Sequence, residues 1–309
     1  MEELNLNLKN EFRAKGYLIC DKIGEGGCSC IYKAQQINTG IFVAIKILKL
    51  SHSYSKLTNF ELITCFKQSN ALYDFLQHSS IVICFGQGEL NNSIPYAIFE
   101  YISGETLKQF LIARTEITSI VLAGIMRQVL EALAYAHSML IVHGDLKPQN
   151  IMIFGSDKEL QVKLIDFGVS KSLAGFKSSD LAFLSPRYNA PEQLKGNSPT
   201  LLSDLYSWAL IFLECLTGAP VILGNSIEEI ACNHLNGEEH VIPEEICKHP
   251  LGKLLAPALN KEANRRELST QYLLEEFMKL DFNTLPNCLL DNQQIYRQNT
   301  DNTILVTLK

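Results

Sequence analysis

Two short motifs in the middle of the chain contain the residue types that the transfer of a phosphoryl group requires. The first motif, HGDLKPQN, supplies Asp145 as a possible base, Lys147 as a cation and Asn150 as an oxygen ligand for a metal ion. The second motif, LIDFG, supplies Asp166 as a further oxygen ligand. Phosphoryl transfer depends on positioning and on charge neutralisation more than on covalent chemistry. The motifs therefore predict a phosphoryl-transfer site.

A glycine-rich turn precedes these motifs. Residues 23–29 read IGEGGCS and lie between strand-like runs at residues 17–19 and 31–34. Glycines let backbone N–H groups approach phosphate oxygens without interference from a Cβ atom. The third glycine of the pattern G-x-G-x-x-G is replaced by Ser29, and the turn does not open a helix, which argues against a dinucleotide-binding turn. Taken alone, the turn fits a structural hairpin as well as a phosphate cover.

A lysine lies inside the next apolar run. Residues 41–48 read IFVAIKIL, and Lys46 is the only charged residue among them. Burial of an ammonium group is unfavourable unless the group finds an anion. Lys46 is therefore a candidate phosphate-binding residue, and the alternative is a lysine at a sheet edge whose ammonium group reaches solvent.

The composition is that of a globular protein. Of 309 residues, 47% are apolar and 19% are charged, and the net charge of −6 makes nucleic acid an unlikely main partner. Nine cysteines show neither a disulfide framework nor metal-ligand spacing, which indicates reduced thiols in a cytoplasmic compartment. The polar N-terminus does not have the pattern of a signal sequence.

Apolar periodicity predicts core helices and no membrane span. Apolar residues at helical spacing predict a helix over residues 118–137. The longest uncharged candidate for a span, residues 205–213, is far shorter than the ~18 residues that a bilayer requires, and we expect it to form a buried helix.

Together the motifs resemble the eukaryotic-type serine/threonine protein kinase family. Besides the motifs above, the chain contains VAIK ending at Lys46 and SPRYNAPE ending at Glu192, and a strongly apolar helix begins near Ser203. The family places an arginine that pairs with the glutamate of Ala-Pro-Glu where this chain has Arg265 and Arg266. We expect Arg266 to pair with Glu192 and Arg265 to be solvated.

The resemblance implies an α+β fold with two lobes. It implies a small N-terminal lobe rich in β-strands with one helix at residues 17–100, and a large, mainly helical lobe at residues 101–280. We expect residues 1–16 to be a polar leader, helical or frayed, and residues 281–309 to be a tail with a possible strand at 304–306.

The resemblance also implies ATP and Mg²⁺ as cofactors and a protein serine or threonine as the acceptor. Asp145 and Lys147 would be the catalytic residues, and Asn150 and Asp166 would hold the metal. Phe99 would be the gatekeeper beside the adenine. The residues implied for nucleotide binding are Ile23, Gly24, Glu25, Gly26, Gly27, Cys28, Ser29, Ile31, Ala44, Lys46, Glu100, Ile102 and Met152.

The sequence departs from the family at the partner of Lys46. The family pairs this lysine with a glutamate nine residues before a His-x-x-Ile-Val motif, and that position is Ser69. Glu61 lies eight residues earlier, about 12 Å along a helix, so it could substitute only if the helix is broken or shifted. This departure leaves open a second hypothesis, a pseudokinase scaffold that catalyses no transfer.

A second departure is Gly144, which replaces the arginine that normally precedes the catalytic aspartate. That arginine docks a phosphorylated activation segment, so we expect activity to be independent of phosphorylation at Ser178 or Ser179.

The string HGD also resembles small-molecule kinases for aminoglycosides or choline, which is a third hypothesis. The sequence as a whole resembles bacterial members of the family. The chain is expected to be cytoplasmic, or secreted into a host cell if it is an effector.

Overall fold

The structure is a computed structural model, and backbone contacts divide the chain into two compact units. The first unit contains the chain up to Gln77 together with Val82–Ser103, and the second contains His78–Ile81 together with the chain from Gly104. The structure describes residues 6–49, 59–91, 93–157, 159–167, 185–237, 240–285 and 288–289.

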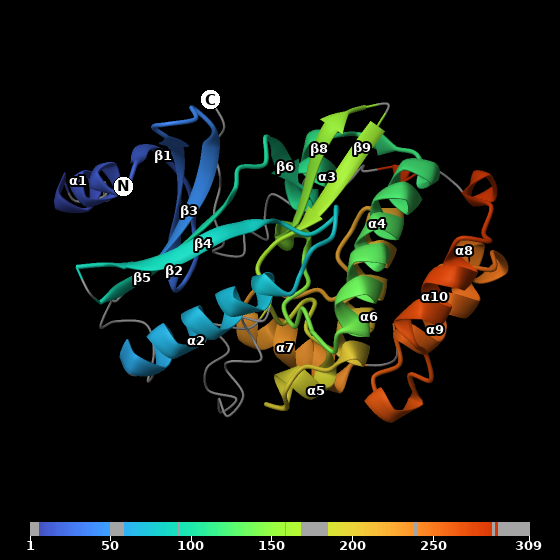
Figure 1. Ribbon diagram of the computed structural model, residues 1–309. Helices are drawn as coiled ribbons and strands as arrows, with labels where there is room; N and C mark the ends of the chain where they lie inside the picture. The colour runs from blue at the N-terminus through green and yellow to red at the C-terminus, as the bar shows by residue number, and fades with distance from the viewer. Residues whose placement is uncertain are drawn as a thin grey trace. The chain divides into compact units, whose positions relative to one another are not determined.

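The first unit is built on a five-stranded sheet in which all neighbouring strands are antiparallel (Figure 1). The strand order is β1 (Tyr17–Glu25), β2 (Ser29–Gln36), β3 (Phe42–Leu48), β5 (Ile94–Glu100) and β4 (Cys84–Leu90). Alternate side chains of β3 point to opposite faces, as the period of two in a strand requires. Val43, Ile45 and Ile47 are buried in the core, whereas Ala44 and Lys46 lie on the other face and are half-buried.

Two helices complete the first unit. They are α1 (Leu6–Ala14), which contacts β1, and α2 (Asn59–Ala71), which contacts β5 and continues into a 3₁₀ turn, η1 (Leu72–Asp74). The expected leader does contain a helix, but it is not merely a polar extension. Phe12 is fully buried in the sheet core and makes an edge-on contact with Tyr96 at 5.1 Å between ring centroids. One aromatic side chain thus attaches an otherwise polar segment to the core.

The second unit contains two small antiparallel sheets. In the first, β8 (Ile151–Ser156) lies between β6 (Gly104–Thr106) and β9 (Glu159–Leu164). In the second, β7 (Glu116–Ile117) pairs with β10 (Cys288–Leu289). The β8–β9 hairpin joins the two motifs that carry the candidate catalytic residues, because β8 follows Asn150 and β9 ends just before Asp166.

The rest of the second unit is mainly helical. Its helix α6 (Leu201–Thr217) begins at a capping box formed by Thr200 and Ser203, and it ends at Gly218, whose φ of 72° suits glycine. The remaining α-helices are α3 (Leu107–Ala113), α4 (Ser119–Ser138), α5 (Pro191–Leu194), α7 (Ile227–Asn236), α8 (Glu244–Lys248), α9 (Gly252–Ala258) and α10 (Thr270–Phe277). Three 3₁₀ turns are η2 (Pro148–Asn150), η5 (Ala263–Arg265) and η6 (Phe282–Thr284).

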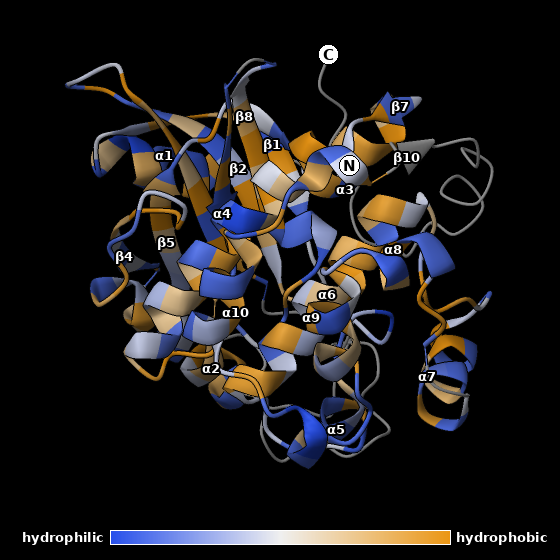
Figure 2. Ribbon diagram, turned by 90° about the vertical axis from the view of Figure 1, so that its right-hand side faces the viewer, coloured by the Kyte–Doolittle hydropathy of each residue, from blue (hydrophilic) through white to orange (hydrophobic). Residues whose placement is uncertain are grey.

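The core of this unit forms around α4 and α6, as the apolar periodicity predicted. Helix α4 contacts α6, α10 and β9, and the fully buried Trp208 of α6 donates its indole N–H to the carbonyl of Met126 at 3.0 Å. Helix α4 is the one described helix that is long and apolar enough to cross a membrane by composition, yet 56% of its most apolar 18-residue window is buried. Figure 2 shows that α7, by contrast, carries both apolar and polar residues.

The expected α+β class is confirmed, since an antiparallel sheet unit precedes a mainly helical unit. The units differ in detail from the expected lobes. The first continues to Ser103 instead of residue 100, and His78–Ile81 belongs to the second unit. Ile81 forms a bridge with Leu164, and Lys163 donates to its carbonyl at 3.2 Å, so a short piece of chain is incorporated into the other core. Of the predicted tail, residues 290–309, with the possible strand at 304–306, lie outside the described residues.

Candidate active site

The loop that begins at His143 is held by one buried carboxylate on α6. Asp204, 1% exposed, accepts the backbone N–H of His143 at 2.7 Å and that of Gly144 at 2.8 Å. The same carboxylate lies 2.8 Å from Nε2 of His137, at the end of α4. A buried carboxylate requires such donors, and three of them converge here from two segments. Asp204 therefore positions the loop against the two central helices.

His143 connects the two motifs. Its Nε2 donates to the carbonyl of Ile165 at 3.0 Å and its Nδ1 accepts from the N–H of Asp145, so the imidazole is neutral. Complete burial lowers the pKa of His143, which agrees with a neutral ring. The ring contacts buried Phe167 at 4.5 Å between centroids. Between these two contacts lies Asp166, with a φ of 63° that is rare for a residue other than glycine.

Asp145, Lys147 and Asn150 form one cluster. Lys147 Nζ lies 2.8 Å from Oδ2 of Asp145. Asn150 donates its side-chain N–H to the backbone carbonyl of Asp145 at 2.8 Å and makes a longer contact, 3.3 Å, with Asp145 Oδ2. The structure thus brings Lys147 and Asn150 within hydrogen-bond distance of Asp145, and Asp145 and Lys147 are mostly buried.

Asn150 and Asp166 fit a hard divalent cation. The backbone of Asn150 accepts from the N–H of Ile165 at 3.0 Å, which places Asp166 next to it. The Asn150 amide nitrogen is engaged by Asp145, so the amide oxygen is the atom that it offers to a cation. Magnesium prefers such oxygen donors and completes its shell with water and phosphate oxygens. Among the described residues there is no cluster of three or more His, Cys, Asp or Glu side chains that would hold a metal by themselves.

In the first unit, the glycine-rich turn closes the β1–β2 hairpin. The N–H of Gly26 donates to the carbonyl of Ser29 at 2.7 Å, and Glu25 pairs with Lys22 and Lys49 on the surface. A Cβ atom added to Gly27 would meet nothing within 4 Å, and its φ does not require glycine. The protein's own contacts therefore do not explain this glycine. The open space beside Gly27 is compatible with the predicted role of the turn as a phosphate cover, which stays a prediction.

Lys46 lies on the same sheet face as the turn. The strand register pairs Gly24 with Ile31 on β1–β2 and Ile31 with Lys46 on β2–β3, so the three residues are adjacent across three strands. Ala44 lies two residues from Lys46 on this face, as the predicted nucleotide pocket requires. Ile23 and Cys28 are half-buried beside them.

The remaining predicted nucleotide-binding residues belong to both units. Glu100 ends β5, where its N–H donates to the carbonyl of Ile83 at 3.0 Å and its carboxylate accepts from the N–H of Ile83 at 2.8 Å. Ile102 follows it in the first unit, whereas Met152 lies on β8 in the second. The shared role predicted for these residues stays a prediction. Phe99 is buried and contacts Tyr73 edge-on at 5.1 Å.

Ser69 occupies a buried position on α2, as the sequence predicted for the missing glutamate. It is 7% exposed, and its hydroxyl donates to the carbonyl of Phe66 at 3.0 Å within the same helix. Helix α2 runs unbroken from Asn59 to Ala71, so no break shifts Glu61 into this position. The structure of the first unit therefore places Ser69, and not a glutamate, at this position of α2.

One residue that contacts the candidate base had no role assigned from the sequence. The hydroxyl of Ser185 donates to Asp145 Oδ1 at 2.9 Å and accepts from Lys147 Nζ at 2.9 Å. The available signal was its place at the start of SPRYNAPE, the segment that ends at Glu192. Because Ser185 lies 40 positions from Asp145 in the sequence, this signal did not indicate a contact between the two residues. Residues 168–184, with the candidate phosphorylation sites, lie outside the described residues.

The predicted ion pair after this segment is present. Arg266, whose side chain is completely buried, makes two hydrogen bonds of 2.7 and 2.9 Å to the carboxylate of Glu192. Burial opposes ionisation of Glu192, but the hydrogen bonds and the charge of Arg266 outweigh it and hold the pKa of Glu192 below its usual value. Arg265 is largely exposed and pairs only with Glu262, as expected of a solvated arginine.

Three aromatic side chains connect α7 with the same segment. His234 Nδ1 lies 2.7 Å from the Pro186 carbonyl, which can only accept, so its Nε2 accepts from the Tyr206 hydroxyl at 2.5 Å. The Tyr206 oxygen then accepts from His240 Nε2 at 2.5 Å. Burial lowers the pKa of His234 to about 4 and that of His240 to about 3, and it raises the pKa of Tyr206.

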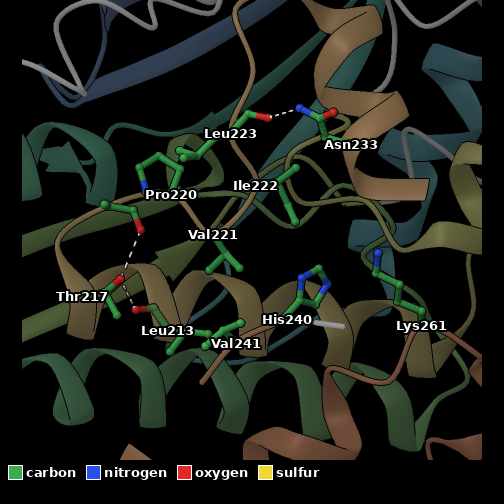
Figure 3. Close-up of a pocket in the computed structure, with 11 residues that line it drawn as sticks. Leu213, Thr217, Pro220, Val221, Ile222, Leu223, Asn233, His240, Val241 and Lys261 are labelled. Atoms are coloured by element: carbon green, nitrogen blue, oxygen red, sulfur yellow. Dashed lines mark hydrogen bonds between the residues drawn. The ribbon is translucent and has the colours of Figure 1, made fainter. Parts of the chain in front are cut away.

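His240 also borders a cavity of about 460 Å³, which Figure 3 shows together with its lining side chains. The walls are mainly apolar, with Lys261 on the polar side, where it donates to the carbonyls of His234 and Gly237. None of the lining residues belongs to the loop that contains Asp145. The cavity is separate from the candidate active site.

Comparison with known proteins identifies the family. Residues 17–278 match the protein kinase domain, so the chain belongs to the protein kinase family. It is 34% identical to the serine/threonine-protein kinase PrkC of Bacillus subtilis over 224 residues, which cover 72% of this chain and 33% of PrkC.

Two further relatives are of similar closeness. One is a probable serine/threonine-protein kinase PknB of Lactococcus lactis, 31% identical over 88% of this chain and 42% of the relative. The other is the serine/threonine-protein kinase PknB of Mycobacterium leprae, 31% identical over 74% of this chain and 36% of the relative. The chain thus spans about a third to two fifths of the length of these curated relatives.

Proposed function

We propose that the protein is a serine/threonine protein kinase that transfers the γ-phosphoryl group of ATP to a protein hydroxyl. The observation that carries the proposal is the contact of Asp145 with the Ser185 hydroxyl at 2.9 Å, beside Lys147. This contact demonstrates that Asp145 Oδ1 can accept a hydrogen bond from an aliphatic hydroxyl. The names of the relatives in Bacillus, Lactococcus and Mycobacterium support a serine or threonine acceptor.

In the proposed reaction the acceptor oxygen forms a bond to the γ-phosphorus while the bond from that phosphorus to the bridging oxygen of the β-phosphate breaks. Asp145 orients the hydroxyl and takes its proton, and ADP leaves with the bridging oxygen. Lys147 stabilises negative charge on the transferred group as a compact cation. Asn150 and Asp166 would hold Mg²⁺, which neutralises phosphate charge when it is bound. Lys46 and the glycine-rich turn would bind the remaining phosphates.

The missing carboxylate at Ser69 favours a second candidate, a scaffold that binds nucleotide without transfer. Magnitudes decide between the two. Loss of one preorganised charge-stabilising group lowers a rate by about 10²–10³. A protein kinase that turns over at roughly 1–100 s⁻¹ would then be slow but active. Because the base and both metal-binding residues are present, we favour the enzyme.

The test is transfer of radiolabelled phosphate from ATP to a generic protein substrate in the presence of Mg²⁺, followed by phosphoamino-acid analysis. We expect phosphoserine or phosphothreonine, and a loss of at least about 10²-fold in rate for Asp145→Asn. The matched control is Asp157→Asn, at an exposed turn between β8 and β9, which should keep the wild-type rate.

Three other outcomes are informative. ATP binding without any transfer would establish the scaffold instead. Transfer only to free aminoglycoside or choline would establish a small-molecule kinase. Equal rates for wild type and Asp145→Asn would remove Asp145 from the role of base.

A further inference from the structure

A buried amide joins the loop of Asp145 to Ser185. Asn189 is 2% exposed, and its Oδ1 accepts from the backbone N–H of Ser185 at 2.5 Å. Its side-chain nitrogen makes a longer contact of 3.5 Å with the carbonyl oxygen of Gly144. The bond to Ser185 is the shorter one, and it holds the N–H of Ser185, whose carbonyl accepts from the backbone N–H groups of Tyr188 and Asn189.

The position of Ser185 matters because its hydroxyl lies between the two candidate catalytic side chains. It donates to Asp145 Oδ1 at 2.9 Å and accepts from Lys147 Nζ at 2.9 Å, while Lys147 also contacts Asp145 Oδ2 at 2.8 Å. These three bonds set the orientation of the Asp145 carboxylate. A shift of about 1 Å in a catalytic group can lower a rate about 10²-fold.

A second amide frees Asn189 for this role. Gln193 donates to the Gly144 carbonyl at 2.8 Å and accepts from the N–H of Ala190 at 3.0 Å, so Gly144 keeps a donor without Asn189. The N–H of Gly144 is held by Asp204. With a φ of 79°, position 144 favours glycine, and it brings no cationic side chain to the segment. The amides of Asn189 and Gln193 therefore hold this segment to the loop at Gly144, in addition to the bonds that Ser185 makes with Asp145 and Lys147.

We propose that Asn189 is a positioning residue, which acts on catalysis through the Ser185 hydroxyl by holding it between Asp145 and Lys147. This proposal rests on the proposed kinase function. An apolar residue at 189 would leave the partly buried N–H of Ser185 without its acceptor, and the segment would move to satisfy it. The Asp145 carboxylate would then lose the hydroxyl that donates to it.

The experiment is a double-mutant cycle with Asn189→Leu and Ser185→Ala in the full chain, measured by phosphate transfer. We expect Asn189→Leu to lower kcat about 10- to 100-fold while the KM for ATP stays unchanged. In the Ser185→Ala background the same change should lower kcat by less than about threefold, because two residues that act as a unit are not additive.

Two further variants separate positioning from folding. Asn189→Ala removes the acceptor without adding bulk and should reproduce the loss of kcat if Asn189→Leu does not fold. Gln128→Leu removes a comparable amide, which joins α4 to the β9 backbone. Gln128 makes no hydrogen bond with Asn189, Ser185 or Asp145. This variant should lower the melting temperature and leave both kcat and the KM for ATP unchanged.

Each result decides something. If wild type is active and folded Asn189→Leu and Asn189→Ala match it, or if the losses of Asn189 and Ser185 add, the positioning role is wrong and the kinase function stands. If wild type transfers no phosphate, the kinase function fails and the positioning role fails with it.

Discussion

A single buried arginine, Arg266, stabilises the end of the SPRYNAPE segment. Its side chain is fully buried, bonded twice to Glu192, and its guanidinium lies 4.5 Å from the centroid of the Tyr206 ring. Three backbone carbonyls, of Asn260, Leu202 and Lys261, accept its other N–H groups. Removal of water from both charges is costly, and these bonds compensate for it. Loss of either partner would therefore leave the other charge buried without its counter-ion.

We predict that Arg266→Ala destabilises the protein by about 3–5 kcal/mol, since it leaves the Glu192 carboxylate buried without its cation. This corresponds to a fall in melting temperature on the order of 10 °C. Differential scanning calorimetry measures it. The matched control is Arg265→Ala, where both partners are more than half exposed and about 0–1 kcal/mol is expected. Equal losses for the two arginines would contradict the assignment.

Between elements, the contact of α6 and α7 with Pro186 depends on neutral histidines. His234 on α7 is fully buried and accepts from Tyr206 on α6, and it donates to the Pro186 carbonyl. The charged groups near this cluster are Arg266, Lys261 and Glu192, and the two cations further disfavour protonation. A second proton on His234 would remove the acceptor of the Tyr206 hydroxyl from this chain of hydrogen bonds.

This arrangement predicts a loss of stability in acid. His234 and His240 have folded pKa values of about 4 and about 3, below the usual 6.5. A depressed histidine pKa means that the unfolded state binds more protons, so stability is full above pH 6.5 and declines as the pH falls from there toward 4. At about 1.4 kcal/mol per pKa unit, the two histidines together contribute several kcal/mol.

Urea unfolding at a series of pH values between 8 and 4 measures this decline. His240→Gln keeps an N–H that can donate to Tyr206 but does not titrate in this range, so we expect a shallower pH dependence for this variant. An identical slope for wild type and His240→Gln would show that His240 does not contribute.

At the scale of the whole molecule, the predicted nucleotide ligands are divided between two units. Lys46 and the glycine-rich turn belong to the first, and Asn150 and Asp166 belong to the second. Each group by itself fits part of a magnesium nucleotide: a phosphate cover with room at Gly27, and a pair of oxygen donors. Binding of the proposed ligand is therefore tested with one substitution in each unit.

We predict that a non-hydrolysable ATP analogue with Mg²⁺ raises the melting temperature. At 100 times the dissociation constant the gain is about 2.7 kcal/mol, or several degrees. Asp166→Asn should abolish the part of the shift that depends on Mg²⁺, and Lys46→Met should reduce the shift with or without the metal. Asp21→Asn, exposed on β1, serves as the control. A wild-type protein that shows no shift would argue against nucleotide binding.

Much of the site could be predicted from the sequence because its residues belong to short local patterns. Asp145, Lys147 and Asn150 lie within one 3₁₀-containing loop, and Asp166 follows β9, which pairs with the preceding strand β8. Local geometry alone brings such residues together. The pairing of Arg266 with Glu192 was also predicted correctly, because the spacing of the family pattern carries this information.

Only the tertiary structure revealed the residues that hold the site in place. Three of the side-chain hydrogen bonds join residues that are far apart in the sequence. The separation is 40 residues for Ser185 and Asp145, 60 for Asp204 and Gly144, and 45 for Asn189 and Gly144. Side-chain hydrogen bonds between such distant positions leave no periodicity in the sequence. Burial of Phe12 is of the same kind, since one aromatic residue in a polar helix does not predict that the helix packs on the sheet. Sequence thus determined which chemistry is present, while packing determined which buried polar groups orient it, because an unsatisfied polar group in a core must find its partner wherever the fold brings one.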